Sequence, residues 1–355
     1  MGKTLKELAD FVGGSVIGDG NAVIEKVSGI QEAGPDCITF ISNPKYVRML
    51  RETKAGAVIV SPQIKEAPTS LLVCRNPYLA FARIVEYLMY EAPVYKPGID
   101  PQAHISESAS IGRNVVAMPF AFVGENSSVG ERTVLHPGAS IGRYCRIGSD
   151  CVIHSNAVIY DDTVIGDRVT VNSNCSIGTF GFGYAPDPTA KPGEMWYKIR
   201  QVGRAVIEDD VDIGANSVVN RAAMGETCIC RGAKIDSLTI IAHNCVIGED
   251  TLIISQVGIA GSVKVGKRCT IASQVGIVGH IAIGDDIQIG AKSGINHSIT
   301  EKGAYLGSPA IPAAEGLKSY AMWKKLPQIP ERIRELEREV ARLKQQLEGK
   351  DGQTA

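Results

Sequence analysis

The feature that most constrains this chain is an aliphatic residue that recurs every six positions from Ile105 onward. The first run comprises Ile105, Ile111, Ala117, Val123, Val129, Leu135, Ile141, Ile147, Ile153, Ile159, Ile165, Val171 and Ile177. A period this short is the signature of a β-helix, in which each hexad supplies one short strand and one corner. Three hexads close one coil, so the sequence predicts a mainly β chain built around a parallel β-helix over 103–300.

The six-residue frame is broken twice. A stretch rich in Gly, Tyr and Pro interrupts it over about 179–205, and the frame returns with Ile207, Ile213 and Val219. It then slips by four residues and runs unbroken from Ile229 to Ile295. We expect the aliphatic residues to point inward and to stack about 4.8 Å apart on neighbouring coils. Gly, Asn and Asp follow them and tolerate the backbone angles of tight corners.

Cysteine placement also follows the frame. The chain has nine cysteines, and five of them take the fifth place of a hexad, where Thr, Ala, Val and Ser also occur: Cys145, Cys151, Cys175, Cys245 and Cys269. We interpret these five as small buried apolar residues. No metal site is expected from them.

Residues 1–98 lack the repeat and predict a small α/β domain. Thr4 and Glu7 form a capping-box signature at the start of a helical pattern. Segments 55–60 and 70–74 are typical of buried strands, and Asn76 precedes a second helix that extends to about Tyr90. The proline-rich segment 91–101 is the expected linker.

Residues 301–355 form the expected C-terminal helical extension. The chain turns at 307–312, and a helix is predicted from about Pro330. Its apolar residues are spaced as a heptad seam: Ile333, Leu336, Val340, Leu343 and Leu347. Its basic residues lie mostly off that seam: Arg332, Arg334, Arg338, Arg342 and Lys344. Two interpretations remain, an oligomerisation helix and a docking surface for an acidic partner.

Composition excludes several classes of function. Lys+Arg total 37 against 38 for Asp+Glu, so no basic excess points to nucleic acid. No apolar run of about 18 residues is present, so no transmembrane segment is expected. The N-terminus lacks the layout of a signal peptide, and a cytoplasmic location is expected.

Histidines mark the candidate catalytic site. His243 takes the third place of its hexad, and Gly261 takes the same place one coil on. Gly279, followed by His280, comes next, and His297 comes one coil later. Because coils repeat every 18 residues, these residues form one ladder at about 4.8 Å per coil.

This ladder suits acyl transfer to an amine. A neutral imidazole at His243 can accept the proton that a nucleophile loses. The N–H of Gly261 can meet a developing oxyanion, a contact typically worth ~3 kcal/mol. Two other interpretations stay open: His243 is an exposed corner residue, or histidines bind a metal in a hydratase-like site. His243 and His297 are ~14 Å apart within one chain, so a metal site would need neighbouring subunits.

Several longer motifs resemble a known family, the UDP-3-O-acylglucosamine N-acyltransferases of lipid A biosynthesis, over essentially the full length. The motifs lie at 38–46, 181–187, 196–199, 234–244, 276–280 and 307–312. The resemblance implies a left-handed β-helix and a homotrimer with active sites between adjacent β-helices. It implies transfer of a 3-hydroxyacyl group from acyl carrier protein to the 2-amine of UDP-3-O-acylglucosamine, with no cofactor and no metal.

The resemblance also implies roles for single residues. His243 would be the general base, Gly261 the oxyanion donor and His280 an auxiliary polar group near the thioester or phosphates. Within a uridine-binding N-terminal domain, Phe40 and Tyr46 would sandwich the uracil, whose edge would bond to Asn43. Asp236 and Asn244 would face the sugar.

Two positions differ from the usual pattern of this family: Ser237 stands for Asn, and Ile240 stands for Gln. His297 also stands where a basic residue is common. Two other functions remain as alternatives. One is an acetyl-CoA-dependent nucleotide-sugar acetyltransferase on a similar β-helix, and the other is a non-catalytic structural β-helix trimer.

Overall fold

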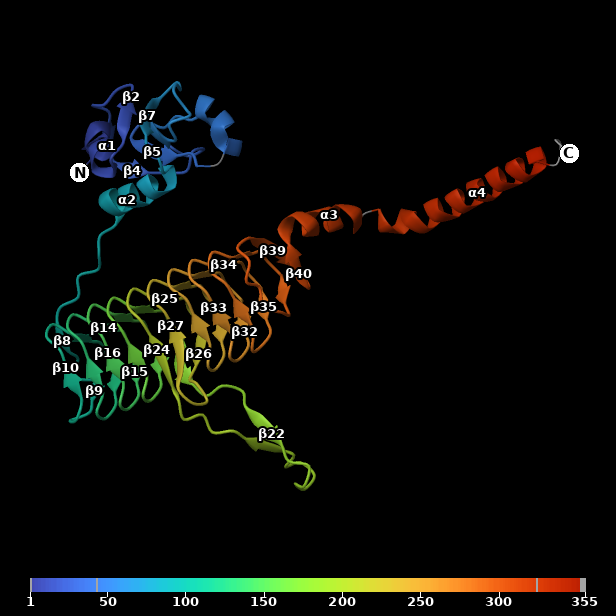
Figure 1. Ribbon diagram of the computed structural model, residues 1–355. Helices are drawn as coiled ribbons and strands as arrows, with labels where there is room; N and C mark the ends of the chain where they lie inside the picture. The colour runs from blue at the N-terminus through green and yellow to red at the C-terminus, as the bar shows by residue number, and fades with distance from the viewer. Residues whose placement is uncertain (1, 43, 324, 352–355) are drawn as a thin grey trace. The chain divides into compact units, whose positions relative to one another are not determined.

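The computed structural model describes residues 2–42, 44–323 and 325–351. The chain divides into two compact units, Met1–Val94 and Tyr95–Ala355. Figure 1 shows the first as a small α/β unit and the second as a coil of short strands that continues into helices.

The N-terminal unit is a sheet covered by helices. Its strand order is β2 (Ser15–Ile17), β7 (Ser70–Val73), β6 (Ala57–Val60), β5 (Cys37–Phe40) and β4 (Lys26–Val27). The other elements are β1 (Lys3–Thr4), β3 (Val23–Ile24), α1 (Leu5–Val12), η1 (Pro44–Arg51) and α2 (Pro77–Met89). Leu8, Ile59 and Ile84 are fully buried between the sheet and the helices.

Both predicted helix starts are present. The hydroxyl of Thr4 accepts a hydrogen bond from the backbone N–H of Glu7 at 3.2 Å, and the Glu7 carboxylate accepts one from the Thr4 N–H at 2.7 Å. This reciprocal pair satisfies backbone donors that have no partner inside the helix. Asn76 caps α2, because its side-chain oxygen accepts from the N–H of Leu79 at 3.1 Å.

The second unit is the predicted parallel β-helix, whose coils pass in turn through three sheets (Figure 1). Sheet 1 contains β8 (Gly98–Ile99), β11 (Val116–Ala117), β14 (Val134–Leu135), β17 (Val152–Ile153), β20 (Thr170–Val171), β25 (Asp212–Ile213), β28 (Lys234–Ile235), β31 (Leu252–Ile253), β34 (Thr270–Ile271), β37 (Gln288–Ile289), β39 (Ala304–Gly307) and the antiparallel β40 (Ala310–Pro312).

Sheets 2 and 3 complete each coil. Sheet 2 contains β9 (His104–Ile105), β12 (Phe122–Val123), β15 (Ser140–Ile141), β18 (Val158–Ile159), β21 (Ser176–Thr179), β26 (Val218–Asn220), β29 (Ile240–Ile241), β32 (Gly258–Ile259), β35 (Gly276–Ile277) and β38 (Gly294–Ile295). Sheet 3 contains β10 (Ser110–Ile111), β13 (Ser128–Val129), β16 (Arg146–Ile147), β19 (Val164–Ile165), β24 (Arg204–Ile207), β27 (Glu226–Ile229), β30 (Val246–Ile247), β33 (Lys264–Val265) and β36 (Ala282–Ile283).

The core is the column of aliphatic residues that the frame predicts. Ile141 pairs with Ile159, and both are fully buried, as is Ile153. The fourth place of the hexad carries the left-handed backbone of the corner. Asn156 has φ 60° there, which suits an Asn side chain, but Arg168 takes φ 56° at the same place. Corner geometry therefore follows the frame even where the residue type does not favour it.

The two breaks in the frame change the spacing of paired residues. Ser176 pairs with Val218, so the insertion between β21 and β24 is absorbed within one coil. The inserted loop contains a hairpin of β22 (Tyr184–Pro186) and β23 (Trp196–Lys198). Buried Gln201 holds its base, since the Gln201 side-chain oxygen accepts from the N–H of Gly181 at 2.6 Å.

The five frame cysteines are buried as expected. The thiols of Cys145 and Cys151 donate to carbonyl oxygens of the next coil at 3.2 and 3.1 Å. Burial raises the pKa of Cys145, Cys151 and Cys245 to about 11, because the interior disfavours the thiolate. These thiols are packing groups.

The ends of the β-helix hold two elements that the sequence did not predict. Strand β8 lies in the expected linker and already pairs with β11. After the last coil, α3 (Ala313–Trp323) packs on β39 and β40, between the expected turn at 307–312 and the helix predicted from about Pro330. Gly316 permits this contact, because a Cβ there would lie 2.6 Å from Leu306.

The predicted C-terminal helix is present as α4 (Ile329–Asp351), which follows η2 (Leu326–Gln328). Ile333, Leu336 and Val340 line one exposed groove on it, so the described part of the seam faces outward. The side chains of Lys344 and Leu347 lie outside the described residues. No helix in the described ranges is long and apolar enough to cross a membrane.

We predict that Ile153→Ala destabilises the β-helix by about 2–5 kcal/mol, because it leaves a cavity in the inward column. Val152→Ala on the same strand is the matched control, since Val152 points outward and is half-buried. Urea unfolding followed by circular dichroism measures both variants. Equal losses of stability would contradict the assignment of inward and outward positions.

Candidate functional site

The candidate site lies at the corner where each coil passes from sheet 2 to sheet 3. His243 occupies this corner between β29 and β30. Strand β32 pairs with β29 one coil on, with Ile259 opposite Ile241, so Gly261 takes the same place on the next coil. The frame thus brings His243 and Gly261 together although 18 residues separate them.

The imidazole of His243 lies directly against Gly261. A Cβ added to Gly261 would lie 2.6 Å from Cε1 and 2.7 Å from Nε2 of the His243 ring. Any side chain at this position would therefore displace the ring. In the described part of the chain the N–H of Gly261 donates to no acceptor, which leaves this donor available beside the imidazole.

The side chain of Asn244 determines which nitrogen of His243 carries the proton. Its Nδ2 donates to the carbonyl oxygen of Met224 at 2.8 Å, and its Oδ1 accepts from the N–H of Ala223 at 3.0 Å. These two bonds orient the amide, so the atom 3.1 Å from His243 Nδ1 is an acceptor. Neutral His243 then carries its proton on Nδ1 and keeps a free lone pair on Nε2, beside Gly261.

Asn244 is itself held by the preceding coil. Its backbone N–H donates to the hydroxyl of buried Thr227 at 2.7 Å, and its φ of 61° is one that Asn tolerates. Asn244 thus positions the His243 ring. The contact with the sugar that the resemblance implies for Asn244 stays a prediction.

The rest of the ladder continues along the same corner. The N–H of His280 donates to the carbonyl oxygen of Gly261 at 3.0 Å, and the His280 side chain is exposed. His297 is also exposed, and its Nδ1 lies 2.7 Å from the side-chain oxygen of Asn296. Among the described residues no hydrogen bond or ring contact joins His297 to His243. The structure therefore groups His243, Gly261 and the His280 backbone, and leaves the His297 side chain apart.

An apolar groove of about 810 Å³ opens on the outer face of sheet 2, beside this corner. Its floor includes Gly258, Gly276 and Gly294, which pair directly with one another on three successive coils. Ile240 lies at one end, and Ser308 and Pro309 line the other. Ala242 and Ala260, which also line the groove, immediately precede His243 and Gly261, so the groove ends next to the corner that holds the imidazole.

Packing does not explain two of these glycines. A Cβ added to Gly276 would meet nothing within 4 Å, and one at Gly258 would only touch Ile240 at 3.9 Å. Glycine in a strand costs roughly 0.5–1 kcal/mol relative to alanine, so an open position occupied by glycine indicates close approach of a ligand or another backbone. In the sequence these glycines are visible as a series spaced 18 residues apart. The spacing alone does not show that the space around them is open, so the groove could not be predicted from it.

Asp236 lies at the other end of β29, at the corner between sheets 1 and 2. Its carboxylate accepts hydrogen bonds from the Ser255 hydroxyl and from the N–H of Ser237 at 2.7 Å. These hydrogen bonds stabilise the ionised carboxylate and hold the pKa of Asp236 below its usual range, and the bond from Ser255 has the largest effect. Asp236 is therefore an oriented, ionised carboxylate. Within one chain the length of β29 separates it from His243.

The expected uracil residues lie in the N-terminal unit. Phe40, at the end of β5, packs on Phe81 in a tilted arrangement with ring centroids 4.1 Å apart, and its centroid lies 5.7 Å from that of Tyr78. Tyr46 is on η1 and is 52% exposed. Asn43 lies outside the described residues. No ring contact in the described ranges joins Phe40 to Tyr46, so a base between them is an expectation that the structure leaves untested.

Comparison with known proteins identifies related sequences over almost the whole chain. A family model described as UDP-3-O-(3-hydroxymyristoyl) glucosamine N-acyltransferase, LpxD, matches residues 21–87. A second model, the bacterial transferase hexapeptide (six repeats), matches residues 144–179.

Two full-length relatives illustrate the similarity. The UDP-3-O-acylglucosamine N-acyltransferase of Syntrophotalea carbinolica is 54% identical over 96% of this chain and 97% of its own length. The protein of the same name from Geobacter sp. strain M21 is 52% identical over 98% of this chain and 99% of its own length.

A solved structure supports the fold. A UDP-N-acetylglucosamine acyltransferase from Arabidopsis matches 62% of this chain and 76% of its own, with a TM-score of 0.55 and 21% identity. At that identity the likeness concerns the fold alone. Together with the hexapeptide match, it confirms a left-handed β-helix of hexapeptide repeats.

Proposed function

This chain belongs to the UDP-3-O-acylglucosamine N-acyltransferase family of lipid A biosynthesis, and we propose that His243 and Gly261 are the centre of its acyl-transfer reaction. The substrates proposed are a 3-hydroxyacyl group on acyl carrier protein and the 2-amine of UDP-3-O-acylglucosamine. The product is the UDP-2,3-diacylglucosamine. The observation that carries this proposal is the close approach of the His243 imidazole to Gly261, which leaves no room for a Cβ.

The geometry supports direct transfer without an acyl-enzyme. The amine attacks the thioester carbonyl and loses a proton to Nε2 of His243, whose other nitrogen is held by Asn244. The carbonyl oxygen becomes an oxyanion and accepts a hydrogen bond from the free N–H of Gly261. When the carbon–sulfur bond breaks, the thiolate of the carrier leaves and takes up a proton, which restores neutral His243.

The groove on sheet 2 supports a long acyl group. Its glycine floor exposes backbone without side chains next to the reacting corner, and its lining is mainly apolar. An alkyl chain gains roughly 0.8 kcal/mol for each buried CH₂, so a groove of this size favours a long-chain donor over an acetyl group. Ile240, which replaces the family's usual Gln, adds apolar surface at the end of this groove.

The chemistry of the remaining side chains suggests which part of the substrates each of them binds. Asp236 is an ionised acceptor suited to sugar hydroxyl or amine groups, and His280 is exposed beside the Gly261 coil. Phe40 and Tyr46 offer aromatic faces for uracil, with Asn43 as its edge partner. Because β29 separates Asp236 from His243 in one chain, we place the complete site between adjacent chains of a homotrimer.

Exposed apolar surface supports that assembly. Phe182 and Tyr197 in the inserted loop are 88% and 72% exposed, and the seam of α4 is open. Such surface is characteristic of interfaces. All nine cysteines are free, which fits the cytoplasmic location we propose, since disulfides are rare there.

We predict that His243→Ala lowers kcat by about 10²–10⁴-fold, because no other group takes the proton of the amine. The assay is mass-spectrometric detection of diacylated product from 3-hydroxyacyl carrier protein and UDP-3-O-acylglucosamine. His104→Ala, an exposed histidine near the start of the β-helix, is the control and keeps wild-type rates. Near-normal kcat in His243→Ala, or turnover only with acetyl-CoA, would refute the proposal.

A second prediction concerns the groove. Gly276→Leu fills its floor, and because Gly276 has open space around it, the protein folds. We expect kcat/KM for the longest accepted acyl donor to fall at least about tenfold, a change of ~1.4 kcal/mol, while a shorter donor is much less affected. Gln288→Leu, outward-facing on the same coil in sheet 1, controls for added apolar bulk. Loss of activity that is equal for every chain length would argue against the groove as the acyl site.

A further inference from the structure

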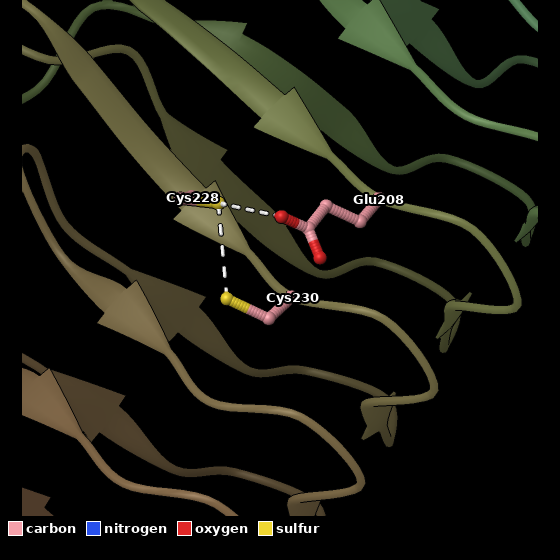
Figure 2. A group of neighbouring side chains, drawn as sticks. All are labelled: Glu208, Cys228 and Cys230. Carbon is pink, nitrogen blue, oxygen red and sulfur yellow. Dashed lines mark hydrogen bonds between the residues drawn. The ribbon is translucent and has the colours of Figure 1, made fainter.

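Two cysteines outside the set explained by the repeat meet a carboxylate on the outer face of sheet 3. Cys228 is on β27, Cys230 directly follows that strand, and Glu208 directly follows β24 on the preceding coil. Figure 2 shows the three side chains turned toward one another. The repeat does not reveal this cluster, because Cys228 and Cys230 do not take the buried fifth place.

Their distances are close to those between ligands of one tetrahedral metal ion. The Sγ atoms of Cys228 and Cys230 are 3.9 Å apart, and Cys228 Sγ is 3.9 Å from Oε1 of Glu208 (Figure 2). With zinc–sulfur bonds of about 2.3 Å and zinc–oxygen bonds of about 2.0–2.2 Å, tetrahedral angles put sulfur atoms ~3.8 Å apart and sulfur and oxygen ~3.6 Å apart. Small side-chain rotations therefore suffice to bind an ion.

The carboxylate is already oriented. Oε2 of Glu208 accepts a hydrogen bond from the N–H of Arg231 at 2.8 Å, which turns Oε1 toward Cys228. A hydrogen bond from the surrounding backbone to a ligand of this kind is typical of metal sites, because it fixes the ligand in place.

The position of the cluster in the frame is unusual. Glu208 and Cys230 take the place after the inward aliphatic residue, which in the neighbouring coils of sheet 3 is glycine, as at Gly148, Gly166, Gly248 and Gly266. A Cβ at Gly248 would lie 2.4 Å from the backbone of Gly266. The two side chains occur where β24 and β27 pair over four residues each: Glu208 follows the insertion, and Cys230 comes directly after the four-residue slip.

These thiols also differ from the packing cysteines. Cys145, Cys151 and Cys245 are buried and donate to carbonyl oxygens of the chain. Cys228 and Cys230 are only half-buried, and the Cys228 thiol lies against the other two members of the cluster. An ion from solution can reach them.

We propose that Glu208, Cys228 and Cys230 bind one zinc ion. Because thiolates are soft ligands, a set of two thiolates and one carboxylate selects zinc over the hard cations magnesium and calcium. Binding releases the two thiol protons to solvent. Three protein ligands leave the fourth position for water or for a group from outside the chain. The ion would join consecutive coils at the place where the repeat is interrupted, and this role is independent of acyl transfer.

Cobalt(II) is a suitable probe, because thiolate coordination gives it charge-transfer absorption and tetrahedral geometry gives it intense visible bands. We would titrate the full chain with cobalt and then with zinc, under a phosphine reductant that does not supply thiols. We expect one cobalt ion per chain, displaced by one zinc ion, and protection of two accessible thiols from a thiol reagent. Cys145→Ala is the matched control and binds as the wild type does.

Substitution of each proposed ligand tests whether the three side chains bind the ion. Cys228→Ser and Cys230→Ser should each weaken zinc binding by at least about a hundredfold, and Glu208→Gln by about tenfold or more. Unchanged affinity in all three variants would overturn the proposal. So would a reduced wild-type chain that binds no metal, even if Cys228 and Cys230 form a disulfide on oxidation, since the pair would then be a redox couple.

Discussion

The structure depends on the stacking of aliphatic side chains from one coil to the next. Within the unbroken runs of the frame each inward Ile or Val contacts its equivalent 18 residues away, and that contact fixes the register of the three sheets. Once the register is fixed, every outward and corner position is repeated at the same spacing. His243 lies against Gly261 for this reason, and Gly258, Gly276 and Gly294 line up for the same reason. The catalytic geometry is thus a consequence of core packing, and the residues that react contribute little to the fold.

The repeat made the β-helix predictable, because an inward residue every six positions has one physical solution. The caps at Thr4 and Asn76 were equally readable, since both are local hydrogen-bond patterns. The alignment of His243 with Gly261 also followed from counting. The role of Asn244 did not, because it depends on contacts with Ala223 and Met224 in the slipped segment, which obey no period. Helix α3 was missed because its packing depends on one small residue, Gly316, against Leu306.

The position of the groove and that of the thiol cluster have a common explanation. In a β-helix the inward positions are committed to packing, so chemistry must use the outward and corner positions. Removal of side chains from three aligned outward positions makes a groove, and addition of side chains at positions that are normally glycine makes a cluster of ligands. Glu208 follows the insertion and Cys230 directly follows the four-residue slip, so the cluster lies on the two coils next to the breaks in the frame. Breaks in the frame are therefore places to look for function in other chains of this kind.

If His243 and Gly261 act as one unit because they are in contact across a single coil, their substitutions must be coupled. A double-mutant cycle on kcat for acyl transfer, with His243→Ala, Gly261→Ala and the double variant, measures this coupling. We expect Gly261→Ala to lower kcat at least about tenfold, ~1.4 kcal/mol, when the imidazole is present, since its methyl group displaces the ring. In the His243→Ala background the same change should have almost no effect. An equal loss in both backgrounds would show that the two residues act independently.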